Sequence, residues 1–308
     1  MVFTLLSICL STIKVKGLRL WSLINTNVIS QGGQTKLMFD DLKKFKPNNK
    51  SVFVLGSSHA YRGYDPRLFN QVQINLFNMG TSGQNMKDTY VLLKLNKQKI
   101  HQIILDIYPG VLQDITEEST LMLIQNANTN STALEILKNN ITINSVNNMV
   151  SRWLDVIPSG IPCQEKYIYN GYIQRDSNYN GGLGGKFDKF EPGANFVYLD
   201  SILKFASALK MRTCIASHPL KWNEAYKIYY QTTYLPELNK VLLKYNKIPF
   251  FDFTFEHSNQ DSLFSDANHL NQKGVNYYNA KLIEKLKKFG VFEDSVFIES
   301  TLNMCKIQ

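Results

Sequence analysis

The feature that most constrains this chain is the apolar run at 52–55, Val-Phe-Val-Leu, which leads directly into Gly56-Ser57-Ser58. Four apolar residues that end at a glycine are typical of a strand buried on both faces of a parallel sheet. Gly56 has no Cβ and lets the backbone turn sharply. Reactive groups of open α/β sheets collect beyond the carboxyl ends of the strands. The run therefore predicts a buried strand that presents Ser58 at such an edge.

The rest of the chain repeats this alternation of strand and helix. Further strands are predicted over residues 74–79, 100–108, 213–216 and 248–253. Helical spacing of apolar residues covers 37–46, 84–97, 198–209, 224–244 and 271–289, with a kink expected at Pro236 and a short helix after Asp65-Pro66. The alternation predicts an α/β fold: a three-layer α/β/α sandwich around a parallel, flavodoxin-like sheet of five strands.

The predicted domain spans 47–290 and carries one insertion at about 111–195, between a segment at 1–46 and a tail at 291–308. The insertion lacks the strand–helix rhythm, and its glycine run at 181–185 is either a flexible surface turn or part of a substrate-binding lid. The apolar run at 2–13 is shorter than the ~20 residues of a bilayer span. It is either a membrane anchor or export signal, or an apolar segment that packs on the domain.

Composition narrows the class of partner. The 308 residues carry a formal charge of +9, but the 34 basic residues are scattered, which argues against a nucleic-acid interface. The four cysteines form no C-x-x-C pair, and no His/Asp/Glu cluster has metal-ligand spacing, so we expect neither metal nor cofactor. Cys214 is expected in the core. A disulfide between Cys163 and Cys305 is left open by their spacing.

Three separated residues fit acyl transfer through a serine. The hydroxyl of Ser58 needs a base to act as a nucleophile, and the downstream Asp266-Ala267-Asn268-His269 supplies a candidate. His269 would be the general base, and Asp266 would orient its ring and stabilise its charged form. The backbone N–H groups of Ser58 and of Gly83, at a strand-to-helix turn, would stabilise an oxyanion.

These residues resemble the SGNH, or GDSL-like, hydrolases. Gly56-Ser57-Ser58 is similar to the first block of that family with Ser57 replacing an Asp, Gly83 matches the second, and Asp266–His269 matches the last. The stretch 56–63, together with Tyr108-Pro109-Gly110, resembles the sequences of one subgroup of this family. That subgroup is found among bacterial envelope and surface-polysaccharide proteins. The resemblance implies a serine-dependent ester hydrolase or acyltransferase that acts on acyl, notably acetyl, esters of envelope carbohydrate. It also implies a place outside the cytoplasm, near a membrane.

One block departs from the family. The usual third block holds an Asn whose side chain donates to the oxyanion, and the corresponding stretch 105–110 has none. Asn85 and His218 are candidate replacements. Without such a donor, hydrolysis by water should be slow, and transfer to a bound sugar hydroxyl is favoured.

Several alternatives stay open. Ser57 is a rival nucleophile. His59 is too close in sequence to reach Ser58 as a base, so we interpret it as a positioning residue, and His59 and His218 are candidate substrate-binding residues. Arg62 and Asp65 are expected to pair locally, and Asp106 is expected to be a buried, hydrogen-bonded carboxylate. The alternative function is a non-catalytic glycan-binding or polysaccharide-assembly protein on the same fold.

Overall fold

The structure, a computed structural model, describes residues 14–15, 18–19, 32–113, 117–153, 163, 165–179, 195–245 and 248–291. The apolar run at 2–13, the glycine run at 181–185 and the tail beyond 291 lie outside these residues, so the expectations about them stay predictions. The short strands β1 (Lys14–Val15) and β2 (Leu18–Arg19) pair antiparallel. In the part of the chain that is described, no helix is both long and apolar enough to cross a membrane.

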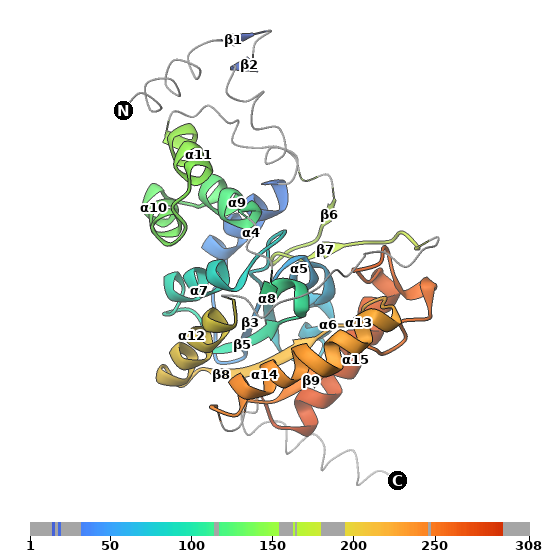
Figure 1. The fold of residues 1–308 in the computed structure, drawn as a ribbon. Coiled ribbons are helices and arrows are strands. Elements are labelled where there is room, and N and C mark those ends of the chain that lie inside the picture. The colour runs from blue at the N-terminus through green and yellow to red at the C-terminus, as the bar shows by residue number, and fades with distance from the viewer. Residues whose placement is uncertain are drawn as a thin grey trace, which may run out of the picture.

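A five-stranded parallel sheet forms the centre of the molecule (Figure 1). Its strands are β3 (Ser51–Leu55), β4 (Asn75–Asn78), β5 (Gln102–Asp106), β8 (Arg212–Ser217) and β9 (Phe250–Asp252). Their spatial order is β4-β3-β5-β8-β9, which is the flavodoxin-like order. All five predicted strands are confirmed, although each of them begins or ends a residue or more away from the predicted bounds.

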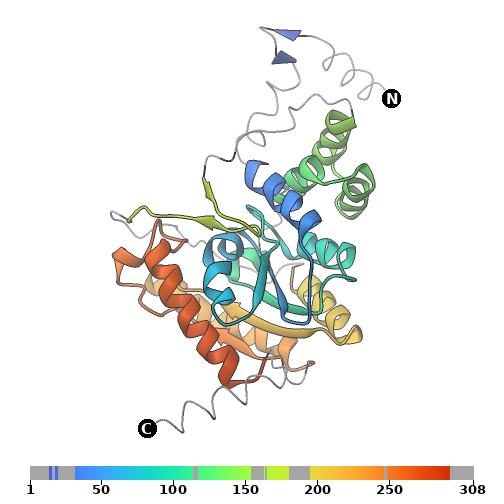
Figure 2. The ribbon, with the colours of Figure 1, turned by 180° about the vertical axis from the view of Figure 1, so that it is seen from behind.

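Helices cover both faces of this sheet. Alternate residues of a strand point to opposite faces, so Phe53 and Leu55 join one core cluster while Val52 and Val54 join another. The first cluster is covered by α4 (Gly32–Lys44), α7 (Met86–Leu95), α12 (Asn195–Ala208) and α14 (Leu235–Leu242). The second lies under α5 (Ser58–Gly63), α6 (Pro66–Asn70) and α15 (Gln272–Lys288), and Figure 2 shows α15 in red across that face. The predicted three-layer sandwich is confirmed.

Helix α4 is an integral part of the domain. The helix was predicted over 37–46, but it already begins at Gly32. Met38, Phe39 and Leu42 are buried in the main core cluster. The domain therefore includes α4, and its boundary lies at or before residue 32 rather than at 47.

The insertion packs on the domain through helices. It contains α8 (Pro109–Gln113), α9 (Glu118–Asn126), α10 (Asn130–Asn139) and α11 (Ile143–Trp153), then a hairpin of β6 (Lys166–Tyr167) and β7 (Ile173–Gln174). Leu123, Ile136 and Met149 belong to the main core. The hairpin is fixed to the sheet because Asn78 N–H donates to Asn170 O at 2.9 Å. It is also fixed to α4, since the Tyr167 hydroxyl donates to Asp41 at 2.6 Å.

The predicted helix at 224–244 is continuous to Leu242 but contains an irregular turn just before its proline. It consists of α13 (Glu224–Tyr229), a π-helical turn (Tyr230–Tyr234) and α14, in whose first turn Pro236 lies. Proline cannot donate the i→i−4 hydrogen bond, which favours such an irregular turn in the helical pattern.

Candidate active site

Three turns meet at the carboxyl edge of the sheet. A Cβ on Gly56, after β3, would lie 2.8 Å from Asp106 O at the end of β5. A Cβ on Gly80, after β4, would lie 2.6 Å from Ser57 O. Only glycine permits approaches this close. Ser58 is the first residue of α5, so this packing fixes the position of its hydroxyl.

The structure brings Ser58, His269 and Asp266 into one hydrogen-bonded chain. Ser58 Oγ lies 2.8 Å from His269 Nε2, and His269 Nδ1 lies 2.8 Å from Asp266 Oδ1. Asp266 Oδ1 also accepts the backbone N–H of His269 at 2.9 Å, which fixes the carboxylate within its own loop. The loop lies between a 3₁₀ turn (Asp261–Leu263) and α15, at the same edge of the sheet as Ser58.

Burial and neighbouring charges set the protonation of His269. Burial opposes ionisation of Asp266, but the hydrogen bond and charge of His269 outweigh it and lower the pKa of the carboxyl. Burial also lowers the pKa of His269, and the nearby Arg62 and Arg175 lower it further against the opposing effect of Asp266. His269 is therefore neutral near pH 7. Its Nδ1 proton faces the carboxylate, and the Nε2 lone pair faces the hydroxyl of Ser58.

His59 and His218 form a buried stack beside the triad. The ring of His59 lies 3.9 Å from that of Tyr108 and 4.0 Å from that of His218, between centroids. It also meets the ring of His269 edge-on at 5.4 Å. Only 1% of His59 and 2% of His218 are exposed, so little of either surface is open to a substrate. Their role in substrate binding stays a prediction.

His218 and Asn85 are the two candidate replacements for the missing oxyanion donor. His218 Nδ1 lies 2.8 Å from Pro219 O, a group that only accepts, so Nδ1 carries the proton. Burial lowers the pKa of His218 to about 4, so at pH 7 its Nε2 is an acceptor and cannot donate to an oxyanion. Asn85 caps α7, since its Oδ1 accepts Asp88 N–H at 2.9 Å. Gly83 lies in the turn before that cap with a φ of 58°. Oxyanion roles for Ser58, Gly83 and Asn85 stay predictions.

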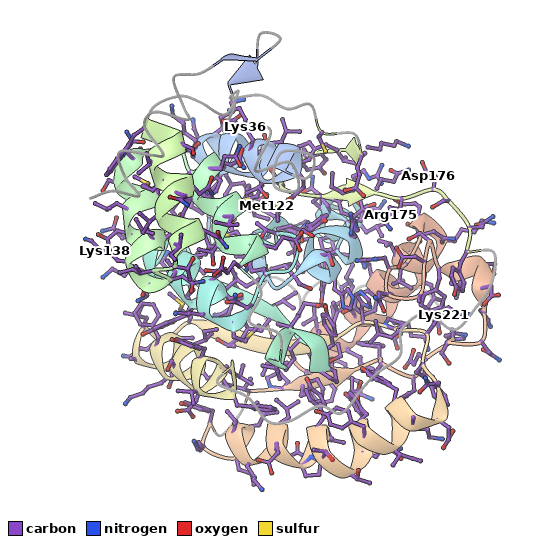
Figure 3. The ribbon with its side chains drawn as sticks, turned by 45° about the horizontal axis from the view of Figure 1, so that its top comes forward. Lys36, Met122, Lys138, Arg175, Asp176 and Lys221 are labelled. Atoms are coloured by element: carbon purple, nitrogen blue, oxygen red, sulfur yellow. The ribbon has the colours of Figure 1, made fainter. Side chains whose placement is uncertain are left out.

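Sequence reasoning missed an ionic cluster around the triad. Arg62 Nη1 lies 3.2 Å from His269 Nε2, and Arg62 Nη2 donates to both oxygens of Glu165 at 2.6 and 2.8 Å. Arg175, on the segment after β7 (Figure 3), donates to Asp266 at 2.5 Å and to Glu165 at 3.1 Å. Glu165 and Arg175 flank the β6–β7 hairpin, whose antiparallel pairing brings them together.

The local pair expected between Arg62 and Asp65 was wrong. Asp65 pairs with Arg67 at 2.7 Å instead. Asp65 is the N-cap of α6 and Arg67 lies in the first turn of that helix, so the two side chains are held side by side. Arg62 contacts His269 of the triad instead.

Asp106 is buried and hydrogen-bonded, as expected. The hydroxyl of Tyr64 donates to its Oδ2 at 2.6 Å, and the hydroxyl of Tyr278 donates to that of Tyr64 at 2.9 Å. Burial raises the pKa of Asp106 to about 7 despite the hydrogen bond from Tyr64. The carboxyl group lies at the end of β5, directly behind the turn that carries Ser58.

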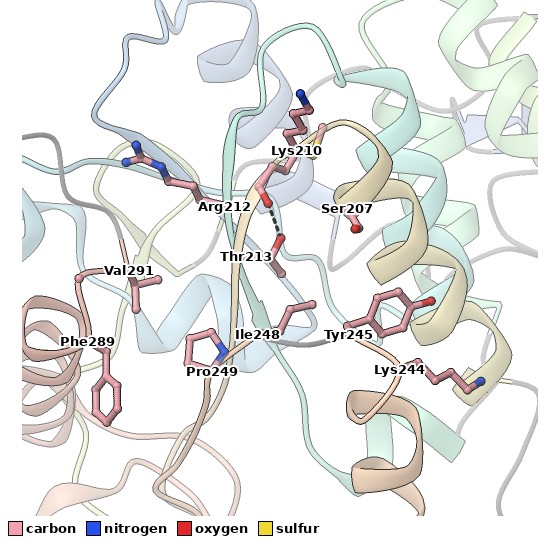
Figure 4. A pocket seen from close by; sticks show the side chains of 12 residues that line it. Ser207, Lys210, Arg212, Thr213, Lys244, Tyr245, Ile248, Pro249, Phe289 and Val291 are labelled. Carbon is pink, nitrogen blue, oxygen red and sulfur yellow. Dashed lines mark hydrogen bonds between the residues drawn. The ribbon is translucent and has the colours of Figure 1, made fainter.

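Other features lie outside the site. Among the described residues, no group of three His, Cys, Asp or Glu side chains could hold a metal ion. Cys163 is half-buried and bonds to no described cysteine, and Cys214 is buried. Cys305 lies outside the described residues, so the disulfide considered between Cys163 and Cys305 stays untested. A pocket lined by residues such as Lys210, Arg212 and Pro249 (Figure 4) lies where β8 and β9 begin. That end of the sheet is opposite Ser58.

A flavodoxin-like sheet with a hydrogen-bonded Ser–His–Asp chain at its carboxyl edge defines the class of site found in serine-dependent acyl-transfer enzymes. No protein-family model and no curated protein matches the sequence. Among solved structures, a "putative acylhydrolase" from Bacteroides fragilis NCTC 9343 is 14% identical, with a TM-score of 0.44 over 83% of this chain and 97% of that one. A GDSL-like lipase from Bacteroides thetaiotaomicron VPI-5482 is 12% identical, with a TM-score of 0.42 over 83% and 98%. Both TM-scores are below 0.5, so neither similarity carries an argument about function.

Proposed function

We propose that the protein is a serine-dependent ester hydrolase or acyltransferase. The observation that carries this proposal is the continuous hydrogen-bonded chain from Ser58 through His269 to Asp266. Ser58 Oγ attacks the acyl carbon while His269 Nε2 takes its proton. Nε2 then gives that proton to the departing alcohol, which leaves an acyl-serine. Water or another hydroxyl repeats the two steps in reverse and releases the acyl group.

The substrate in this proposal is an acyl ester, notably an acetyl ester, of an envelope carbohydrate. Its support is the similarity of residues 56–63 and 108–110 to surface-polysaccharide proteins. Because the third-block Asn is absent, we propose transfer to a bound sugar hydroxyl over hydrolysis, since a positioned acceptor gains from proximity where bulk water does not. Release of p-nitrophenol from its acetate should be slow in water and faster when a glycan acceptor is added. Rapid release that no acceptor changes would contradict transfer.

Labelling by a fluorophosphonate probe tests the nucleophile. Ser58→Ala should abolish labelling and leave the melting temperature nearly unchanged. Ser57→Ala is the matched control: Ser57 is 1% exposed, and no described group bonds to its hydroxyl, so labelling should persist. Loss of labelling in Ser57→Ala alone would reassign the nucleophile. A folded wild type that never reacts would favour the alternative, a non-catalytic glycan-binding or assembly protein.

The proposed location is outside the cytoplasm and near a membrane. Its support is the apolar run at 2–13 and the envelope resemblance. Fractionation of cells that express the full chain checks it, and a wholly cytosolic pool would count against it.

A further inference from the structure

The catalytic base is approached by two hydrogen-bond donors at once. His269 Nε2 lies 2.8 Å from Ser58 Oγ and 3.2 Å from Arg62 Nη1. A guanidinium only donates, and a neutral imidazole nitrogen offers one lone pair, so the two donors share it. When Nε2 takes the proton of Ser58, it becomes a donor itself. Arg62 Nη1 then loses its acceptor and faces a second positive charge.

We infer that Arg62 binds a carboxylate, or an equivalent oxyanion, on the alcohol part of the ester substrate. The inference rests on the proposed function and names the substrate class: acidic alcohols and their esters. Nε2 delivers its proton to the departing alcohol, so a group beside Nε2 stands next to that part of the substrate. A carboxylate there gives Arg62 Nη1 a charge-assisted acceptor when His269 becomes protonated.

The guanidinium is held in place for this role. Arg62 follows Ser58 by four residues on α5, so the two side chains lie on one face of the helix. Its Nη2 is fixed by both oxygens of Glu165, and its side chain is 11% exposed. The Nε is buried without a partner among the described residues. Nη1 is therefore the end of the group that faces the reacting atoms.

The charge balance of the cluster supports an acidic substrate. Arg62 and Arg175 are balanced by Glu165 and Asp266 while His269 is neutral. When His269 takes the proton of Ser58, a positive charge develops on the ring while the matching negative charge develops on the acyl oxygen, and Arg62 already lowers the pKa of that ring. A substrate carboxylate beside Arg62 offsets the positive charge that develops on the ring, so it stabilises the transition state more than the resting enzyme.

Two acetyl esters of matched shape test the charge preference. We expect the full chain to cleave 4-acetoxybenzoate with a kcat/KM at least about tenfold above that for the neutral 4-acetoxybenzamide, as one charge-assisted contact allows. Arg62→Gln should abolish the preference. Arg67→Gln, which removes a carboxylate-paired arginine from the next helix, should keep it. Equal ratios in the wild type and Arg62→Gln would overturn the inference.

A binding measurement separates this inference from the proposed function. Titration with 4-hydroxybenzoate, followed by NMR of His269, should raise the pKa of that ring in the wild type and not in Arg62→Gln, with 4-hydroxybenzamide inert in both. Fluorophosphonate labelling without any charge preference would overturn the anion site alone. Selective benzoate binding without labelling would support the site and overturn the enzyme proposal. If Arg62→Gln does not fold, Arg62→Lys should retain a reduced preference, and a full or absent one would contradict the role of the guanidinium.

Discussion

The protonation of His269 depends on a few neighbours with opposing effects. Burial and the two arginines favour the neutral ring, while Asp266 favours the charged one. The net shift lowers the pKa of His269 below its ordinary value near 6.5. In the proposed mechanism His269 must be neutral to accept a proton, so a lowered pKa would extend activity toward lower pH.

The first prediction concerns this pH dependence. The rate of fluorophosphonate labelling should fall with decreasing pH, with a midpoint below 6.5. Asp266→Asn should reduce the rate by ~10⁴-fold, because the ring loses the partner that holds its tautomer. Asp176→Asn is the control, since that exposed carboxylate pairs with Lys166 outside the triad. A midpoint above 6.5, or equal rates in the two variants, would contradict the prediction.

The sequence could place Ser58, Asp266 and His269 in one site because Ser58 follows a buried strand, and the other two lie in the loop between the last strand and the closing helix. The carboxyl ends of parallel strands share an edge, so the pattern alone brings such residues together. Glu165 and Arg175 carry no such signal. They reach the triad only because the two-residue strands β6 and β7 pair and pack against β4, and strands this short leave no periodic pattern.

At the scale of elements, α4 links the core to the site. Its apolar residues pack in the main core, and its Asp41 accepts hydrogen bonds from Tyr167 and from the backbone of Asn170 in the hairpin. The hairpin in turn presents Glu165 to Arg62. The helix was predicted only from residue 37, because Gly32 and Gly33 weaken the helical pattern at its start.

The second prediction tests how strongly α4 contributes to stability. Leu42 is 4% exposed and packs in the main core, so Leu42→Ala should reduce the free energy of unfolding by about 2–5 kcal/mol. Leu243→Ala makes the same change at a residue that is 79% exposed, and should have little effect. Urea denaturation measures both. Equal midpoints would mean that α4 is not part of the cooperative domain.

At the scale of the whole molecule, the sheet order brings the turns after β3, β4 and β5 into direct contact. Strand β3 lies between the other two, so its turn is held from both sides. Gly56 contacts the end of β5, and Gly80 contacts the turn that bears Ser57. The fold class was predictable from the rhythm of apolar runs. The closeness of these turns was not, because it depends on backbone positions that no residue pattern encodes.

The last prediction follows from that contact. In Gly80→Ala, the new Cβ would lie 2.6 Å from Ser57 O and 2.8 Å from Ala60 Cβ, so the turn before Ser58 must shift. A displacement of about 1 Å at a reacting group costs up to ~10²-fold in rate, so labelling of Ser58 should slow markedly. Gly63→Ala is the graded comparison, since its Cβ would meet only the His218 side chain, at 3.2 Å. We expect a smaller loss there, because a ring can move where a backbone carbonyl cannot. Labelling rates and melting temperatures of both variants measure this difference, and a Gly80→Ala protein that reacts as fast as the wild type would show that the turns are not rigidly coupled.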